Sequence, residues 1–205
     1  MAAILAKKLG MTQRFLDDGR VERVTVLEAG PCPVTAIRTA ERDGYEAVQL
    51  AFVPCKEKSL TRAELGHLKK ASTSAHRVVR EFRDEVGELL VGETVTASAF
   101  APGDRVKVSG LSKGKGFQGT IKRHNFKRGP KSHGSHNVRA PGSIGASATP
   151  SRVLPGLRGP GRMGGGRVTQ RGLTVVDVIP QQNLLMVRGA VPGPRGATVE
   201  VRSDG

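Results

Sequence analysis

The sequence contains no tryptophan, and all aromatic residues together make up only 3% of its 205 residues. Hydrophobic residues of every kind reach 37%. The core must therefore be built mainly from Val, Leu, Ile and Ala, and we expect it to be modest. We expect Phe15, Phe52, Phe82 and Phe100 to belong to it. The length allows one domain of ordinary size with extensions, or two small domains.

Cysteine is also scarce. Only Cys32 and Cys55 are present, and neither belongs to a CxxC pair. This spacing argues against a disulfide framework and against a zinc finger, and it fits a reducing, intracellular setting.

Long hydrophobic runs are missing as well. No stretch approaches the roughly 18 apolar residues that span a bilayer. The N-terminal segment MAAILAKKLG has no basic residue before its apolar residues, and its apolar stretch is too short for a signal peptide. We therefore expect a soluble cytoplasmic protein without a membrane partner.

Acidic residues are absent from one long internal stretch. Between Asp104 and Asp177 there is no Asp or Glu, whereas 15 Lys or Arg fall in that interval. The rest of the chain holds 18 basic and 18 acidic side chains, so the net charge of +15 comes entirely from this stretch. Such an excess of one sign implies a polyanionic partner.

Strands are predicted on both sides of the acid-free stretch. RVERVTVLEAG follows a turn signal, DDG at 17–19, and CPVTAIRT and YEAVQLAFV flank ERDG at a hairpin-like spacing. ETVTASAF and DRVKVSG are also strand-like, while GLTVVDVIPQQNLLMVRG predicts two strands with a tight turn, and ATVEV a last strand. We expect a mainly β body, a meander or barrel, formed by residues 1–110 and 172–205.

Residues 59–86 have a different pattern. Leu60, Leu65 and Leu68 lie near helical spacing, and Thr61 followed by Glu64 is a capping box. SAHRVVREF adds a second short amphipathic turn. We therefore expect a helical insertion at about 59–86, lying against the sheet.

Residues 111–171 lack sustained periodicity. From Gly110 to Gly172 inclusive there are 15 glycines and 5 prolines, and only GFQGTIKRHNF suggests a short helix, with Phe117, Ile121 and His124 on one face. A connection of about 60 residues without regular structure is normally functional or disordered. We expect a long, irregular, basic arm that orders when phosphates neutralise it.

Nucleotide, metal and catalytic interpretations are weak. GKGFQG matches GxGxxG, but the acid that would bind a ribose is missing, and no Walker loop is present. His124, His133 and His136 are candidate metal ligands, yet no carboxylate or cysteine accompanies them. No nucleophile with a base and an orienting acid can be named. We expect no enzymatic activity, cofactor, metal or small-molecule substrate.

Binding of folded RNA explains the arm best. Lysine and arginine neutralise phosphates, glycine permits close backbone approach, and proline stiffens an extended route. No recognition helix or zinc module points to DNA, although an architectural DNA-binding protein or a nucleic-acid chaperone remains the alternative. The candidate RNA-binding residues are Lys113, Lys115, Lys122, Arg123, His124, Lys127, Arg128, Lys131, His133, His136, Arg139, Ser143, Thr149, Arg152, Arg158, Arg162 and Arg167.

Several long motifs, in the same order, resemble the bacterial large-subunit ribosomal protein L-three family over essentially the whole chain. They are KKLGMTQRF at 7–15, SKGKGFQGTIKRHNF at 112–126, APGSIGASATPSRV at 140–153, GRMGG at 161–165 and NLLMVRGAVPG at 183–193. The resemblance implies a β-barrel body of the translation-factor kind and an arm that threads through 23S ribosomal RNA toward the peptidyl transferase centre. It also implies an early role in subunit assembly, no catalysis, and the large-subunit proteins numbered fourteen and nineteen as neighbours.

The resemblance also assigns parts of the arm. By motif, the basic residues from Lys113 to His124 would hold its base to RNA, and residues around 142–149 would form its inner tip. Ala148 stands where some bacterial relatives have a glutamine that becomes methylated, so that modification cannot occur here. Val138 stands where many relatives have histidine. Both departures bear on local contacts of the tip.

Overall fold

The computed structural model describes residues 2–16, 18–83 and 89–204. Its contacts divide the chain into two compact units. One unit comprises Met1–Ser112 and Arg167–Gly205 and is called the body, and the other is Lys113–Gly166 and is called the inserted unit.

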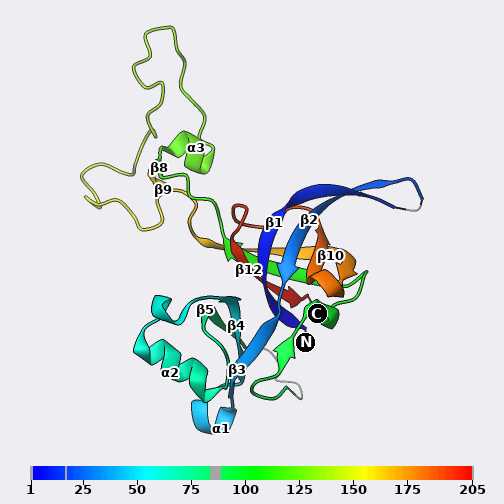
Figure 1. Cartoon of the computed structure of the whole chain (residues 1–205). Helices are drawn as coiled ribbons and strands as arrows, with labels where there is room; N and C mark the ends of the chain where they lie inside the picture. The colour runs from blue at the N-terminus through cyan, green and yellow to red at the C-terminus, as the bar shows by residue number, and fades with distance from the viewer. Residues whose placement is uncertain (1, 17, 84–88, 205) are drawn as a thin grey trace. The chain divides into compact units, whose positions relative to one another are not determined.

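The body contains a closed barrel with the strand order β1-β12-β7-β10-β11-β2 (Figure 1). Its strands are β1 (Ala3–Phe15), β2 (Val21–Ala29), β7 (Arg105–Leu111), β10 (Arg167–Ile179), β11 (Leu184–Arg188) and β12 (Thr198–Ser203). Neighbouring strands are antiparallel throughout. The prediction of a mainly β fold with a barrel is confirmed.

Alternation of side chains explains why the barrel strands form. In β7 the side chains of Val106 and Val108 are fully buried, and in β12 Val199 and Val201 occupy the equivalent inward positions. Burying a side chain of this size contributes roughly 1.5–3 kcal/mol. Strands from both sides of the inserted unit therefore share one core.

A second sheet has the strand order β5-β4-β3-β6. Its strands are β3 (Cys32–Arg38), β4 (Ala47–Pro54), β5 (His76–Phe82) and β6 (Thr94–Val95). β3 and β4 pair antiparallel and are joined through the short helix α1 (Ala40–Asp43), which confirms the predicted hairpin. The core cluster includes Phe52, Phe82 and Phe100.

The predicted capping box begins helix α2 (Arg62–Lys70). Thr61 Oγ1 accepts a hydrogen bond from the Glu64 amide, and Glu64 Oε2 accepts one from the Thr61 amide at 2.8 Å. Leu68 is the buried residue of this helix. Two orphan amides are thus satisfied, and the helix begins where the sequence predicted.

The expected second helical turn at SAHRVVREF is wrong, because residues 76–82 form strand β5. Val78 and Val79 face Phe52 and Ala51 of β4 in an antiparallel register. Two adjacent β-branched residues suit a strand better than a helix, and the exposed edge of β4 supplies the pairing partner. Residues 84–86 of the expected insertion lie outside the described residues.

Two further expectations need correction. Only Thr94–Val95 of ETVTASAF pairs as a strand, and Ala97–Ala99 form the 3-10 turn η2. Phe15, expected in the core, is 66% exposed. The turn after it is closed by a hydrogen bond from the Leu16 amide to the Arg20 carbonyl, and Asp17 of the predicted DDG turn lies outside the described residues.

The predicted turn between β10 and β11 is confirmed as η3 (Pro180–Gln182). A further 3-10 turn, η1 (Glu57–Ser59), precedes α2.

The two cysteines should differ sharply in reactivity. Cys32 is fully buried, and burial raises the pKa of its thiol to about 12, whereas Cys55 is partly exposed. Near pH 8 about one Cys32 thiol in ten thousand is therefore ionised. A thiol titration of the native chain should show one fast-reacting group, and Cys55→Ser should remove it. Two fast thiols in the native chain would contradict the buried position of Cys32.

Candidate nucleic-acid interface

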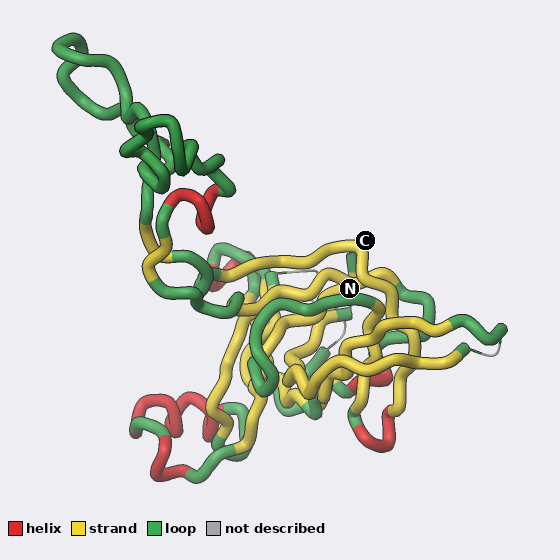
Figure 2. Tube along the Cα trace, turned by 90° about the horizontal axis from the view of Figure 1, so that it is seen from above, coloured by secondary structure: helices red, strands yellow, loops and turns green. Residues whose placement is uncertain are grey.

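The inserted unit begins and ends at neighbouring positions of the body. β7 ends at Leu111, β10 begins at Arg167, and these two residues are opposite each other in the antiparallel ladder. The unit consists mostly of loop, with one short helix and one short two-stranded sheet (Figure 2). It can therefore follow the shape of a partner without interrupting the barrel ladder.

The charges of the inserted unit have no internal counterpart. Its 54 residues include 11 Lys or Arg and three His, and no Asp or Glu. Among the described residues, ion pairs join side chains of the body, such as Arg14 with Asp177 and Arg38 with Asp43. The cations of the inserted unit therefore repel one another until an external anion neutralises them.

A short ladder closes the base of the inserted unit. β8 (Phe117–Gln118) pairs antiparallel with β9 (Gly161–Arg162). Beside it, the Lys115 amide donates to the Met163 carbonyl, and the Met163 amide donates to the Gly116 carbonyl, each at 2.9 Å. The outgoing and returning chains are thus held together before the loop opens.

Gly164 is required at this base. Its φ of +69° lies in the left-handed region, and a Cβ there would overlap the Lys113 carbonyl oxygen. Any other residue would strain the backbone and push the two chains apart.

We expect Gly164→Ala to open the base. The strain should accelerate tryptic cleavage after Lys113 and Lys115 about tenfold, because closed backbone resists proteolysis. Gly159→Ala is the matched control, since a Cβ at that position has open space. Limited proteolysis followed by mass spectrometry measures both, and equal cleavage rates would show that the Gly164 contact does not hold the base.

Helix α3 (Thr120–His124) follows the ladder and confirms the predicted short helix. Arg123 Nη1 donates to the Gly159 carbonyl at 2.8 Å, and His124 Nε2 lies 3.2 Å from the same oxygen. Both side chains are half-buried, whereas Lys122 is exposed. Arg123 and His124 therefore hold the returning chain against α3, and Lys122 is the one free to reach a partner.

Phe117 does not lie on the face of α3 that the sequence suggested. It belongs to β8 and is 77% exposed. Gly119 precedes α3 with extended backbone, so the helix starts too late to include Phe117. An exposed aromatic ring in this acid-free unit is a platform on which a base can stack.

A second closure shapes residues 127–138. The Gly129 amide donates to the Val138 carbonyl at 3.1 Å, and a Cβ on Gly129 would overlap the Asn137 carbonyl oxygen. Lys127, Arg128 and Lys131 line a hollow together with Gly129 and Val138. The fold-back concentrates three cations in a space that suits an anion.

The distal loop is the most open part of the inserted unit. All residues from 139 to 158 are exposed. Ser143 Oγ donates to the Gly145 carbonyl at 3.2 Å, and Ser151 Oγ donates to the carbonyl of Ala148. Ile144, Leu154 and Leu157 line a shallow hollow there beside Arg152. This loop offers both a cation and apolar surface to a partner.

Most of the candidate RNA-binding residues are exposed, and only Arg123 and His124 are half-buried. The exposed ones are Lys113, Lys115, Lys122, Lys127, Arg128, Lys131, His133, His136, Arg139, Ser143, Thr149, Arg152, Arg158, Arg162 and Arg167. Arg167 lies in the body and forms an ion pair with Glu200. Arg171, which is not among these candidates, is also exposed on β10 within the acid-free stretch.

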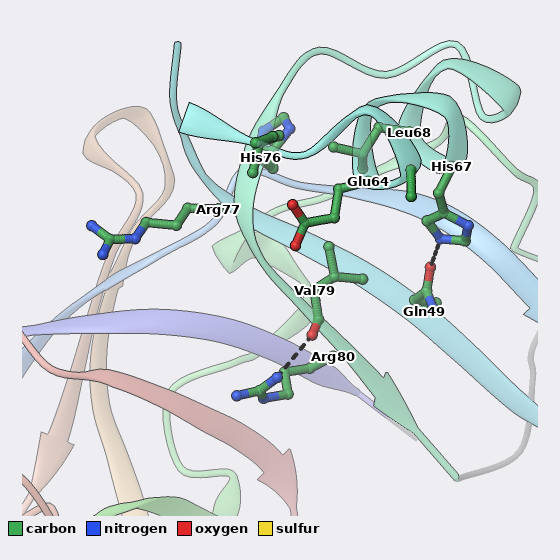
Figure 3. Close-up of a pocket in the computed structure, with 10 residues that line it drawn as sticks. Gln49, Glu64, His67, Leu68, His76, Arg77, Val79 and Arg80 are labelled. Carbon is green, nitrogen blue, oxygen red and sulfur yellow. Dashed lines mark hydrogen bonds between the residues drawn. The ribbon is translucent and has the colours of Figure 1, made fainter. Parts of the chain in front are cut away.

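A pocket of the body is built differently. It lies between α2 and strands β4 and β5 (Figure 3). His67 Nε2 lies 2.5 Å from Gln49 Oε1, and Gln49 also bonds Thr35 and Glu81. The Glu64 carboxylate accepts a hydrogen bond from the Thr61 amide at the start of α2. These groups are satisfied by the protein itself and fix α2 to the sheet.

Other classes of site find little support in the described ranges. They contain no cluster of three His, Cys, Asp or Glu side chains suited to a metal ion. None of the helices there has the length and apolar character that a membrane crossing requires.

The sequence also matches known proteins. A family model described as Ribosomal protein L3 matches residues 73–183. The protein named large ribosomal subunit protein uL3 from Synechococcus sp. (strain JA-3-3Ab) is 53% identical over 200 residues, covering 97% of this chain and 94% of the relative. The protein of the same name from Thermosynechococcus vestitus is 51% identical over 199 residues, with the same coverage. The family model matches more than half of the chain, and these relatives are more than 50% identical to it over nearly its full length. The chain therefore belongs to the ribosomal protein L3 family of the large ribosomal subunit.

Proposed function

We propose that this chain is a structural constituent of the large subunit that binds 23S ribosomal RNA directly and helps to nucleate subunit assembly. The inserted unit would be the main contact. The observation that supports this most strongly is its charge pattern, 11 basic side chains without a single acid in a loop-rich unit closed at its base.

Lysines, arginines and the half-buried residues of the inserted unit would have different roles in RNA binding. Exposed lysines such as Lys113 and Lys122 would neutralise phosphates and release counterions. Arginines such as Arg152 and Arg158 would add bidentate phosphate contacts and stacking. Arg123 and His124 would act mainly by positioning the loop.

We further propose that residues 111–171 act as one arm and that its tip at 142–149 points toward the peptidyl transferase centre. The chain outside this arm, residues 1–110 and 172–205, would then be available to neighbouring proteins, including those numbered fourteen and nineteen. The motifs shared with the family support these assignments.

Competition between nucleic acids tests the proposal. At fixed salt, a 23S ribosomal RNA fragment should bind at least about tenfold more tightly than duplex DNA of equal length. Attraction to phosphates is common to both nucleic acids, so the difference would come from contacts specific to the folded RNA. Electrophoretic mobility shifts with each competitor measure the ratio. Equal affinities would favour an architectural DNA-binding protein or a nucleic-acid chaperone instead.

Lys122 and Arg123 should give different mutant signatures. Lys122→Ala should reduce the slope of log affinity against log salt by roughly 0.7–0.9, the value for one phosphate contact. Arg123→Ala should lower affinity with a smaller change of slope, because it removes the bond to Gly159. Fluorescence anisotropy between about 50 and 200 mM salt measures both. Lys58→Ala, at an exposed position of the body, is the control, and identical slopes for the two variants would contradict the division of roles.

A further inference from the structure

Three arginines surround one carboxylate where the barrel meets the second sheet. The Glu200 Oε2 atom in β12 forms ion pairs with Arg167 of β10 and with Arg202 of β12, the second at 3.4 Å. The Glu200 Oε1 atom lies 4.0 Å from Nε of Arg80 in β5. The Arg202 guanidinium also lies 4.7 Å from the centre of the Phe82 ring. One acid therefore joins cations from both sheets, and we call Glu200 with these three arginines the arginine cluster.

The arginine cluster retains an excess of positive charge. Glu200 supplies one negative charge for three arginines, and it is the only acid in β7, in β12 and in residues 167–174 of β10, which together hold five Lys or Arg. Two acids close to the cluster in the sequence have other partners. Asp204 accepts a hydrogen bond from a backbone amide at 3.0 Å, and Glu81 accepts one from the Tyr45 hydroxyl at 2.9 Å. The excess suits a polyanion.

Two arginines of the cluster are open to solvent, and the carboxylate that holds them is not. The side chains of Arg80 and Arg167 are 61% and 60% exposed, whereas that of Glu200 is 12% exposed. Arg80 Nη1 also donates to the Val79 carbonyl at 3.1 Å (Figure 3). A guanidinium carries five N–H donors, more than these contacts use. Both forks are thus oriented before a ligand arrives, which lowers the entropy cost of binding.

We propose that Arg80 and Arg167 together bind a backbone phosphate of RNA, and that Glu200 is the positioning residue that orients both guanidiniums. Guanidinium forks bind phosphate oxygens in a bidentate manner. An acidic protein surface would match the charge as well, but Arg167 directly follows the inserted unit in the chain, so RNA held by that unit is the nearest polyanion. The inference rests on the proposed function, because it takes 23S ribosomal RNA as the ligand and extends its contact to the body.

Glutamine substitutions in the full chain test the phosphate contact. Arg80→Gln combined with Arg167→Gln should lower the affinity for intact 23S ribosomal RNA about tenfold, as expected when charge-assisted hydrogen bonds are lost. The slope of log affinity against log salt should fall by roughly 0.7–0.9, the value for one phosphate. Filter binding between about 50 and 200 mM salt measures both.

Arg42→Gln is the matched control for this double variant. Arg42 is 68% exposed and is paired with Asp43 at 2.9 Å, outside the arginine cluster. Its substitution should change neither the affinity nor the slope. If the double variant of Arg80 and Arg167 behaves like this control, the phosphate contact is overturned, and the arginines serve an acidic protein or stability alone.

Glu200→Gln tests the positioning role through the sign of its effect. Removal of an acid should raise RNA affinity if charge alone mattered, whereas loss of positioning should lower it about three- to tenfold. Glu200→Asp keeps the charge and should lose less. In the background of the double variant of Arg80 and Arg167, Glu200→Gln should cause no further loss, because its effect acts through those arginines. An unchanged or higher affinity, or an equal loss in both backgrounds, contradicts the positioning role.

Duplex DNA as competitor separates failure of this inference from failure of the proposed function. If 23S ribosomal RNA is not the specific ligand, the unmodified chain will bind it and duplex DNA equally. If only the phosphate contact of Arg80 and Arg167 is wrong, the unmodified chain will prefer 23S ribosomal RNA, and the double variant will keep the same affinity and salt slope. Urea unfolding verifies that each variant is folded, and the exposed positions of Arg80 and Arg167 make that outcome the expected one.

Discussion

Replacing the inserted unit by a linker of about five Gly and Ser residues should lower the affinity for 23S ribosomal RNA by roughly 10³-fold near 150 mM salt, since the cations proposed to neutralise most of the phosphates would be removed. Fluorescence anisotropy with a labelled RNA fragment measures the decrease. A variant that keeps the loop but replaces its 11 Lys and Arg by Gln separates charge from shape, and its affinity should fall nearly as far. Retained affinity in either variant would place the RNA contact on the body.

The body should remain folded after that excision. Leu111 and Arg167 are opposite each other in the β7–β10 ladder, so a hairpin-length linker can join the two strands. The buried core cluster contains no residue of the inserted unit. Circular dichroism should therefore show intact β-structure, and the midpoint of urea unfolding should lie close to that of the full chain. Loss of cooperative unfolding would mean that the inserted unit contributes to the core.

Leu185→Ala should lower the free energy of unfolding by about 2–5 kcal/mol, the range for a large cavity in a packed core. Leu185 is fully buried in β11 and lies opposite Leu27 of β2 and Val178 of β10. The cavity would weaken the barrel where strands from both ends of the chain meet. Urea unfolding monitored by circular dichroism measures the change.

The control for that prediction is Leu90→Ala. Leu90 is mostly exposed, so its truncation should change the free energy of unfolding by less than about 0.5 kcal/mol. A Leu185 variant within about 1 kcal/mol of the unmodified chain would contradict a close-packed barrel interior.

Local patterns in the sequence predicted the elements that local chemistry determines. The capping box at Thr61 and Glu64 located the start of α2, and the spacing around ERDG located the β3–β4 hairpin. The absence of acids identified the stretch that contains the inserted unit. Family membership confirms the expectations that the chain is not an enzyme and that it resides in cytoplasmic large subunits.

Long-range partners could not be read from the sequence in the same way. β5 looked helical because its pairing with β4 depends on residues 22 to 34 positions earlier in the chain. Closure of the barrel depends on pairing between β1 and β12, at opposite ends of the sequence. Phe15 was expected in the core because hydrophobicity alone does not reveal where neighbouring strands end.

The same limit applies to the candidate site. Arg123 looked like any other cation of the arm, and only the folded loop shows that it donates to the carbonyl of Gly159. Arg167 falls in the acid-free stretch, yet the barrel places Glu200 beside it. Charge composition identified the segment, whereas the individual role of each cation depends on the tertiary neighbours it meets.

The salt dependence of RNA binding tests the central claim most directly. Affinity for one 23S ribosomal RNA fragment is measured between about 50 and 200 mM salt, for the full chain and for the chain without the inserted unit. The full chain should give a steep slope of log affinity against log salt, and excision should flatten it by several units, about 0.7–0.9 for each phosphate that the protein no longer neutralises. Equal slopes for the two chains would contradict the claim that the inserted unit is the main phosphate contact.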